Sequence, residues 1–153
     1  HGLGLNDIQE VIAEMGPFPG AKEFVDWLRT HFQLIILSDT FYEFAHPLMK
    51  QLGWPTIFCH KIETDEKGMI TAYKLRQPDQ KREAVKALHG LNYRVIAAGD
   101  SYNDTTMLGE ADKGFLFDAP ENVIKEFPQF PAIHGYAALK EAIRNASVRD
   151  IPA

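Results

Sequence analysis

The chain has 153 residues, of which 45% are hydrophobic and 24% are charged, and its formal net charge is −5. This composition fits one folded domain, long enough to bury roughly 70% of its unfolded surface. The acidic balance without a basic stripe argues against nucleic-acid binding, the apolar runs are too short to span a membrane, and a single cysteine excludes an internal disulfide. We therefore expect a cytoplasmic protein that binds neither nucleic acid nor a membrane.

Hydrophobic periodicity predicts helices and strands that alternate along the chain. The expected strands are residues 34–37, 56–59, 94–98 and 114–117, with a β-hairpin over 61–64 and 69–73. The expected helices are 8–15, 21–30, 41–52, 79–88, 105–110, 120–127 and 136–145, with Pro47 either kinking or dividing the third. This order predicts an α/β fold with a mostly parallel, Rossmann-like sheet flanked by helices.

A polar loop with the sequence GDSYND, residues 99–104, follows the apolar run at 95–98. Asp100 is the first polar side chain after the strand, so its carboxylate would leave the edge of the sheet as a hard oxygen ligand of the kind that Mg²⁺ takes. Asp104 could cap the following helix or reach the water shell of the metal. The alternative is that both acids are only turn and capping residues.

Two other element ends carry groups suited to a phosphate. Ser38 follows the strand at 34–37 and offers a hydroxyl donor, and Lys81 near the start of the helix at 79–88 offers an ammonium. Together with Asp100, these groups could hold a phosphoryl group and neutralise its charge during in-line transfer. Taken singly, Ser38 could satisfy a strand-end amide, Lys81 could be a solvated helix charge, and Asn103 could be a turn residue.

In order and spacing, these segments resemble the last three motifs of the haloacid dehalogenase-like superfamily. Four stretches are similar to its phosphoserine phosphatase and phosphoserine:homoserine phosphotransferase subgroup: SDTFYEF (38–44), CHK (59–61), GDSYNDTTML (99–108) and APENVI (119–124). The resemblance covers almost the whole chain. It implies an Mg²⁺-dependent phosphatase or phosphotransferase that acts on phosphoserine through an aspartyl-phosphate, with water or homoserine as the acceptor.

Residue by residue, the resemblance implies a metal site and a substrate site. Asp100 would bind Mg²⁺, Asp104 would support it, and Lys81 would neutralise charge on the phosphate and on the nucleophile. The substrate site would comprise Ser38, Asp39, Lys81 and Asn103. Subgroup members with a phosphatase role alone carry small glycines after the motif serine, whereas Asp39 and Thr40 stand there in this chain, which favours the phosphotransferase-like members.

One departure from the superfamily pattern concerns the nucleophile, an aspartate that follows an N-terminal strand in a D-x-D-like motif. Asp7 precedes helix-like residues and Asp26 lies within a predicted helix, so neither is a candidate. We expect residues 1–16 to be the end of a helical cap and residues 17–153 to be the core without its first strand. That strand would sit between those ending at Ser38 and Asp100, so its absence predicts an unfilled slot through which the chain could self-associate.

Other readings of the sequence lead to different functions. The chain could be a truncated, catalytically inactive α/β module that only binds a partner. A receiver domain would need a phospho-accepting aspartate on a strand, and a dinucleotide-binding fold would need G-x-G-x-x-G, which is absent. Cys59 and His60 show no zinc-ligand spacing with other cysteines or histidines, so we expect them to be structural.

Overall fold

The structure, a computed structural model, describes residues 4–153 and divides the chain into two compact units, His1–Pro78 and Asp79–Ala153. Each unit contains one three-stranded sheet. Among the described residues, three of the four strand pairings are parallel, which confirms the predicted α/β class with mostly parallel strands. No helix in residues 4–153 is both long and apolar enough to cross a membrane.

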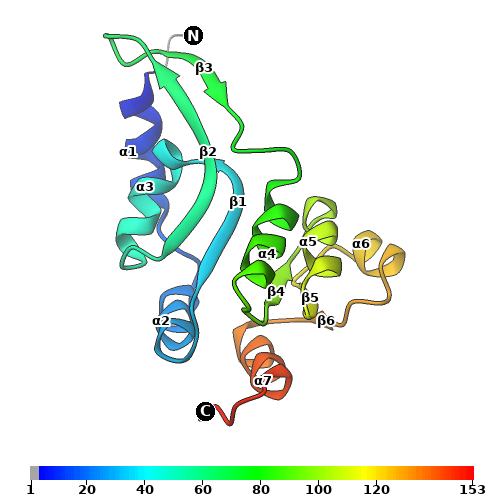
Figure 1. The fold of residues 1–153 in the computed structure, drawn as a ribbon. Coiled ribbons are helices and arrows are strands. Elements are labelled where there is room, and N and C mark those ends of the chain that lie inside the picture. The colour runs from blue at the N-terminus through cyan, green and yellow to red at the C-terminus, as the bar shows by residue number, and fades with distance from the viewer. Residues whose placement is uncertain (1–3) are drawn as a thin grey trace. The chain divides into compact units, whose positions relative to one another are not determined.

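The first unit has the strand order β1-β2-β3 (Figure 1). Strand β1 (Ile35–Phe41) pairs in parallel with the first half of β2 (Thr56–Thr64), and the second half of β2 pairs antiparallel with β3 (Ile70–Lys74). The predicted hairpin is therefore confirmed, but its first strand is continuous with the strand predicted at 56–59. The helices of this unit are α1 (Leu5–Met15), α2 (Ala21–His31) and α3 (Tyr42–Gln51).

Strand β1 differs from its prediction in two respects. It continues through Ser38 and Asp39 to Phe41 instead of ending at residue 37, because Phe41 still lies in register with His60 of β2. Its residues 35–37 are partly exposed rather than fully buried. The reason is that β1 is the edge strand of its sheet and has β2 as its one neighbour within the described residues.

Helix α3 runs through Pro47 without being divided. Proline has no N–H, so the carbonyl of Glu43, four residues earlier, loses its helical hydrogen bond. The side-chain amide of Gln9 in α1 donates to that carbonyl at 2.7 Å and replaces the missing donor. Helix α3 and the residue that follows it supply a buried hydrophobic cluster of this unit, formed by Ala45, Met49 and Leu52.

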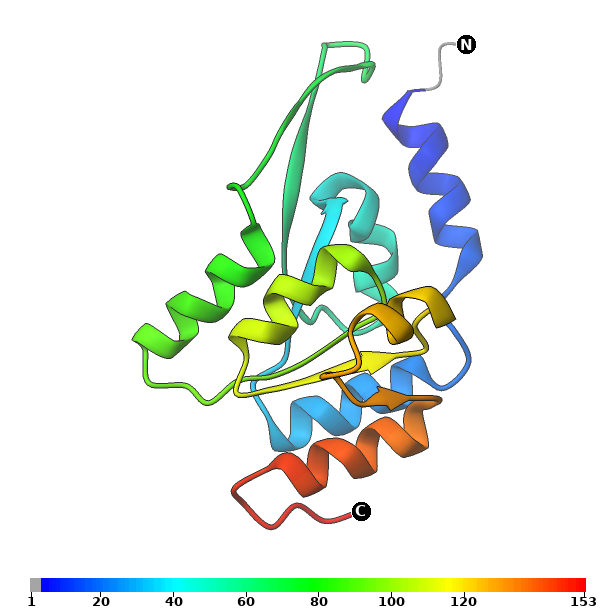
Figure 2. The ribbon, with the colours of Figure 1, turned by 90° about the vertical axis from the view of Figure 1, so that its right-hand side faces the viewer.

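The second unit has the strand order β4-β5-β6, all parallel, formed by β4 (Ile96–Gly99), β5 (Lys113–Phe117) and β6 (Ala132–Ile133). Its helices are α4 (Gln80–Gly90), α5 (Thr105–Glu110), α6 (Glu121–Glu126) and α7 (Tyr136–Ala146). Helices α5 and α7 lie on opposite faces of the sheet (Figure 2). The core of this unit includes Val85, Leu108, Leu116, Val123 and Leu139, each at most 2% exposed.

The close packing of α5 against β5 depends on Gly114. A Cβ atom at this position would lie 2.6 Å from the carbonyl oxygen of Leu108 and 2.9 Å from its Cβ. Because the nearest atom belongs to the backbone of α5, a side chain at residue 114 would push the helix away from the sheet.

We predict that Gly114→Ala lowers the free energy of unfolding by about 2 kcal/mol, because the new methyl group overpacks this contact. Urea unfolding followed by circular dichroism measures the change. Gly90→Ala at the end of α4 is the matched control, since a Cβ there meets nothing within 4 Å, and it should leave stability unchanged or slightly raised. Equal stabilities for the two variants would contradict the close contact.

Candidate active site

The residues predicted to form the site fall into two groups, one in each unit. Lys81, Asp100, Asn103 and Asp104 belong to the second unit, and Ser38 and Asp39 belong to the first. Within the second unit, the structure brings together the start of α4 and the loop after β4. We call the two groups the α4–β4 cluster (Lys81, Asp100, Asn103 and Asp104) and the β1-end cluster (Ser38 and Asp39).

The loop after β4 is folded around the carboxylate of Asp104. One of its oxygens, Oδ2, accepts the backbone N–H groups of Asp100 at 2.9 Å and Ser101 at 3.1 Å, and the Ser101 hydroxyl at 3.2 Å. A single 3₁₀ turn, η1 (Tyr102–Asp104), leads from the loop into α5. Asp104 stands at the start of α5 but makes no side-chain capping hydrogen bond to it, so the suggestion that its carboxylate caps this helix is wrong. The carboxylate instead binds the N–H groups that precede it and fixes the backbone that carries Asp100.

Gly99 permits this close approach between the loop and the end of β4. A Cβ atom at residue 99 would lie 2.5 Å from the Cβ of Asp104 and 2.6 Å from its Oδ2. Any side chain at this position would therefore displace the Asp104 carboxylate from the backbone amides that it binds.

The other oxygen of Asp104, Oδ1, accepts a hydrogen bond from the ammonium of Lys81 at 2.8 Å. The two side chains are 9% and 11% exposed, so this is a buried ion pair and Lys81 is not a solvated surface charge. Burial by itself would raise the pKa of Asp104, but the hydrogen bond and charge of Lys81, with the N–H groups of Ser101 and Asp100, outweigh it and hold the pKa below its usual value. Asp104 is thus an anion in the folded state at neutral pH.

Asp100 and Asn103 lie on the exposed side of this loop. A carboxylate at the end of a parallel strand is a hard oxygen donor suited to Mg²⁺, which takes one or two carboxylates and completes its shell with waters and substrate phosphate. No group of three or more His, Cys, Asp or Glu side chains among residues 4–153 could enclose a metal by itself. The donor set therefore fits Mg²⁺ held by Asp100 together with oxygens from other sources, and it does not fit a closed structural metal site.

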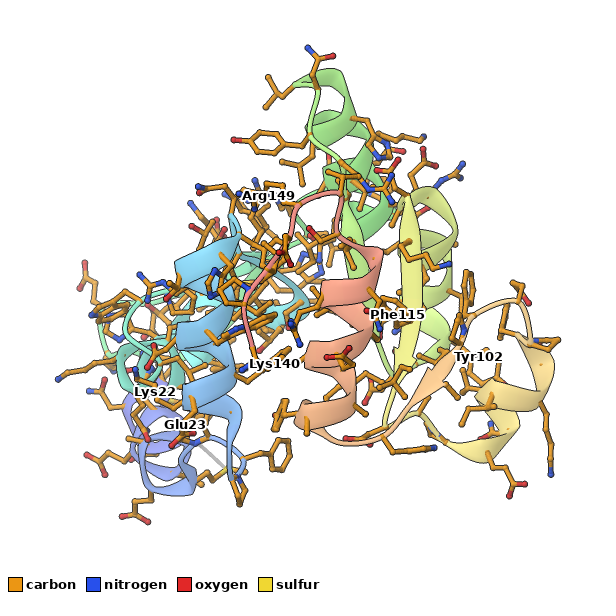
Figure 3. The ribbon with its side chains drawn as sticks, turned by 90° about the horizontal axis from the view of Figure 1, so that it is seen from below. Lys22, Glu23, Tyr102, Phe115, Lys140 and Arg149 are labelled. Carbon is orange, nitrogen blue, oxygen red and sulfur yellow. The ribbon has the colours of Figure 1, made fainter. Side chains whose placement is uncertain are left out.

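Tyr102 is a member of the loop that the sequence did not single out. Its hydroxyl donates to the carboxylate of Glu126 at 2.7 Å and accepts from the amide of Asn122 at 3.3 Å, which fastens the loop to α6 (Figure 3). The hydrogen bond to Glu126 raises the pKa of Tyr102. No local sequence signal marks this contact, because the partners are 20 and 24 residues away.

The β1-end cluster lies on the last part of β1. The Ser38 hydroxyl oxygen accepts the backbone N–H of Thr40 at 3.2 Å, which fixes the orientation of the side chain. Asp39 is half-exposed, and its Oδ1 lies 3.8 Å from Nε2 of His60 on the neighbouring strand β2. Cys59, beside His60, is 1% exposed, and burial, followed by the charge of Glu43, raises the pKa of its thiol to about 11, so it stays protonated.

A family model of haloacid dehalogenase-like hydrolases matches residues 4–112. The chain belongs to this family. This match confirms the resemblance found in the sequence. Because the family consists of hydrolases, the match also supports the prediction that the chain is part of an enzyme.

Relatives with known names are similar over 99% of the chain. Phosphoserine phosphatase ThrH of Pseudomonas aeruginosa is 64% identical over 151 residues, and the chain covers 74% of it. A phosphoserine phosphatase of Pseudomonas syringae pv. tomato is 62% identical over 151 residues, and the chain covers 64% of its length. The chain thus corresponds to between three fifths and three quarters of these two proteins.

Solved structures share the fold at lower identity. A substrate-bound phosphoserine phosphatase has a TM-score of 0.76 and 20% identity, covering 94% of this chain and 70% of that one. The phosphoserine phosphatase from T. onnurineus has a TM-score of 0.72 and 24% identity, covering 94% and 67% of the two chains. At this level of identity the likeness shows the α/β fold.

We predict that Lys81→Met destabilises the chain by about 3 kcal/mol, because it leaves the Asp104 carboxylate buried without its counter-charge. Lys86→Met is the matched control: Lys86 lies on the same helix but pairs with Glu83 on an exposed face, where such pairs contribute about 0.5 kcal/mol or less. Urea unfolding at pH 7 measures both. Similar losses in the two variants would show that the Lys81 pair behaves as a surface contact.

The lowered pKa of Asp104 predicts how stability depends on pH. The ionised carboxylate is favoured in the folded state, so its contribution is full above the usual pKa near 3.8 and is lost as the pH falls through the lowered folded value. Unfolding free energies measured from pH 6 down to pH 2 should fall more steeply for the wild type than for Asp104→Asn. Glu66→Gln at the exposed hairpin turn serves as the control and should keep the wild-type slope.

Proposed function

We propose that the chain carries the phosphate-binding and metal-binding groups of an Mg²⁺-dependent phosphoserine phosphatase or phosphotransferase. The observation that carries this proposal is the buried Lys81–Asp104 pair, which holds the loop bearing Asp100 at the carboxyl end of β4. The relatives at 64% and 62% identity, both named phosphoserine phosphatase, support phosphoserine as the substrate. That the protein works in the cytoplasm stays a prediction based on its composition.

The proposed roles follow from the charge and hydrogen-bonding capacity of each side chain. The ammonium of Lys81 donates to Asp104, and its positive charge would neutralise the phosphate and the attacking carboxylate. The hydroxyl of Ser38 would donate to a phosphoryl oxygen, and the amide of Asn103 would contact the substrate. Asp104 would act by holding Lys81 and the loop in place.

Asp100 would be the residue of this chain that binds Mg²⁺. The ion would supply positive charge next to the phosphoryl oxygens, which lowers the cost of the charge that develops there. The backbone hydrogen bond from Asp100 to Asp104 keeps the position of this ligand fixed before any substrate binds.

The nucleophile is proposed to lie outside these 153 residues. Asp7 lies in the first turn of α1, where its carboxylate accepts the Gly4 N–H as a helix cap, and Asp26 lies within α2 and pairs with Lys22. Neither follows a strand. Strands β1 and β4 are edge strands of their sheets, so each is placed to accept a further strand, or a second copy of the chain.

The proposed reaction has two displacements at phosphorus. An aspartate oxygen from the added strand forms a bond to phosphorus as the bond to the serine oxygen breaks, giving an aspartyl-phosphate and serine. A water molecule or the hydroxyl of homoserine then attacks phosphorus and releases the aspartate. Homoserine as acceptor is suggested by the resemblance of residues 38–44 to the phosphotransferase-like members.

We predict that the 153-residue chain alone releases no phosphate from phosphoserine with Mg²⁺, and that the chain extended by an upstream strand ending in D-x-D does. Asp100→Asn or removal of Mg²⁺ with EDTA should abolish the release, because both remove the metal site, whereas Asp150→Asn on an exposed segment should not. Malachite-green assays measure phosphate, and ³¹P NMR with added homoserine distinguishes the two acceptors.

The outcomes separate the parts of this proposal. Release by the unextended chain would contradict an external nucleophile. An extended chain that folds, binds Mg²⁺ and still leaves phosphoserine intact would contradict the proposed substrate, and would favour a noncatalytic binding module.

A further inference from the structure

Tyr102 stands in the polar loop between Asp100 and Asn103, and the proposed reaction gives it no part. It is 44% exposed, yet its hydroxyl is engaged twice, as donor to the Glu126 carboxylate at 2.7 Å and as acceptor from the Asn122 amide at 3.3 Å. The hydrogen bond to Glu126 raises the pKa of Tyr102, so the hydroxyl stays protonated at neutral pH and remains the donor. The two partners lie four residues apart, on one face of α6.

The ring of Tyr102 is anchored as well. It meets Phe127, the residue that follows α6, edge-on, with ring centroids 5.8 Å apart and planes at 73°. Phe127 stacks on Phe130 at 6.4 Å, and a Cβ atom at Gly109 of α5 would lie 3.9 Å from Cζ of Phe130. Because Val123 fixes α6 in the core at 2% exposure, Tyr102 is attached to a part of the unit that is itself held in place.

The loop has two halves that different groups hold. In the first half, the Asp104 carboxylate binds the backbone N–H groups of Asp100 and Ser101. The second half is a single turn, closed by the hydrogen bond from the Asp104 N–H to the Ser101 carbonyl at 3.0 Å. Tyr102 and Asn103 are the two central residues of this turn, so they project from it.

The direction of the turn is therefore set by what its central side chains bind. Asn103 is exposed, so packing does not fix its amide. The side chain of Tyr102, in contrast, connects the turn to α6 through its hydroxyl and its ring. A change in the Tyr102 contacts would tilt the peptide that carries Asn103 and would leave the Asp100 backbone on the Asp104 carboxylate.

We propose that Tyr102 is a positioning residue for Asn103, and that its contacts with α6 hold the turn so that the Asn103 amide is directed at the substrate. This inference rests on the proposed function, in which Asn103 contacts the substrate. An uncharged amide gains from a hydrogen bond only within a narrow range of distance and angle, so its effect depends on the orientation of the turn.

Three substitutions separate the hydroxyl contacts from the packing of the ring. Tyr102→Phe removes both hydroxyl contacts and keeps the ring against Phe127. Glu126→Ala removes the acceptor, whereas Glu126→Gln keeps an oxygen acceptor on a side chain of the same length. Tyr93→Phe is the matched control, because Tyr93 follows α4 in the same unit, is 48% exposed, and has no hydroxyl partner in residues 4–153.

The kinetic test uses the extended, active protein with phosphoserine and Mg²⁺. Tyr102→Phe and Glu126→Ala should each raise KM on the order of fivefold with kcat nearly unchanged, because the amide contact is weakened equally in the bound substrate and in the transition state. Glu126→Gln and Tyr93→Phe should behave like the wild type. The Mg²⁺ concentration for half-maximal activity should be the same in all four variants, since Asp100 keeps its place.

A double-mutant cycle with Asn103→Ala tests whether Tyr102 acts through that residue. Once the amide is removed, Tyr102→Phe should cause little further increase in KM. Additive effects of the two substitutions would contradict the inference. Thermal unfolding of each variant identifies a purely structural role: lower stability of Tyr102→Phe with an unchanged KM would overturn the inference.

A second readout uses the 153-residue chain and does not depend on activity. Backbone ¹⁵N order parameters report the fast motion of each amide. Tyr102→Phe should lower the order parameter of Asn103 and leave that of Asp100 unchanged, and Tyr93→Phe should change neither. Equal changes at Asp100 and Asn103, or no change at Asn103, would overturn the inference.

Failure of the proposed function would look different. A wild-type extended protein without phosphoserine hydrolysis contradicts the function, whereas normal wild-type hydrolysis with equal behaviour of Tyr102→Phe and Tyr93→Phe contradicts the role of Tyr102 alone.

Discussion

The buried pair of Lys81 and Asp104 is the interaction on which the second unit's polar loop depends. Removing two charges from water is costly, and apolar side chains of the same size would often be as stabilising. What apolar side chains could not do is fold the loop: the oxygen of Asp104 that does not face Lys81 gathers the N–H groups of Asp100 and Ser101. The pair thus links the start of α4 to the loop after β4. The desolvation of its two charges costs free energy, but the pair fixes the position of the Asp100 backbone.

Two glycines near this pair allow the backbone and side chains around it to pack closely. Gly99 lets the Asp104 carboxylate touch the end of β4, and Gly114 lets the backbone of α5 touch β5. Tyr102 adds a tie to α6 on the outer side of the loop. The loop is therefore held from three sides by a strand, a buried cation and a helix, while Asp100 and Asn103 themselves stay exposed. The conformational entropy of this loop is therefore lost when the chain folds, and binding of a ligand would not have to order it.

The sequence predicted those features that depend on neighbouring residues. Apolar runs located the strands that became β1, β4 and β5, and polar residues directly after them marked Ser38 and Asp100. Contacts between residues far apart in the sequence were beyond it: Asp104 meets a lysine 23 residues away, and Asp39 lies near His60 of the neighbouring strand. The two-residue strand β6 is too short to show a pattern, and β1 extends past its apolar run because its backbone pairing, not its hydrophobicity, decides where it ends.

The two units carry different kinds of polar group, and this difference bears on specificity. The α4–β4 cluster contains a buried cation, two carboxylates and an amide, and under the proposed roles the charged groups would act on the phosphoryl group and its metal whichever phosphomonoester is bound. The β1-end cluster instead has a hydroxyl and a half-exposed carboxylate, and a buried imidazole lies 3.8 Å from that carboxylate. Under the proposed roles, a change of phosphoryl acceptor would require substitutions around Asp39, and the Lys81–Asp104 pair could stay as it is. Specificity for the acceptor would then evolve in the first unit without loss of the loop geometry that the chemistry needs in the second.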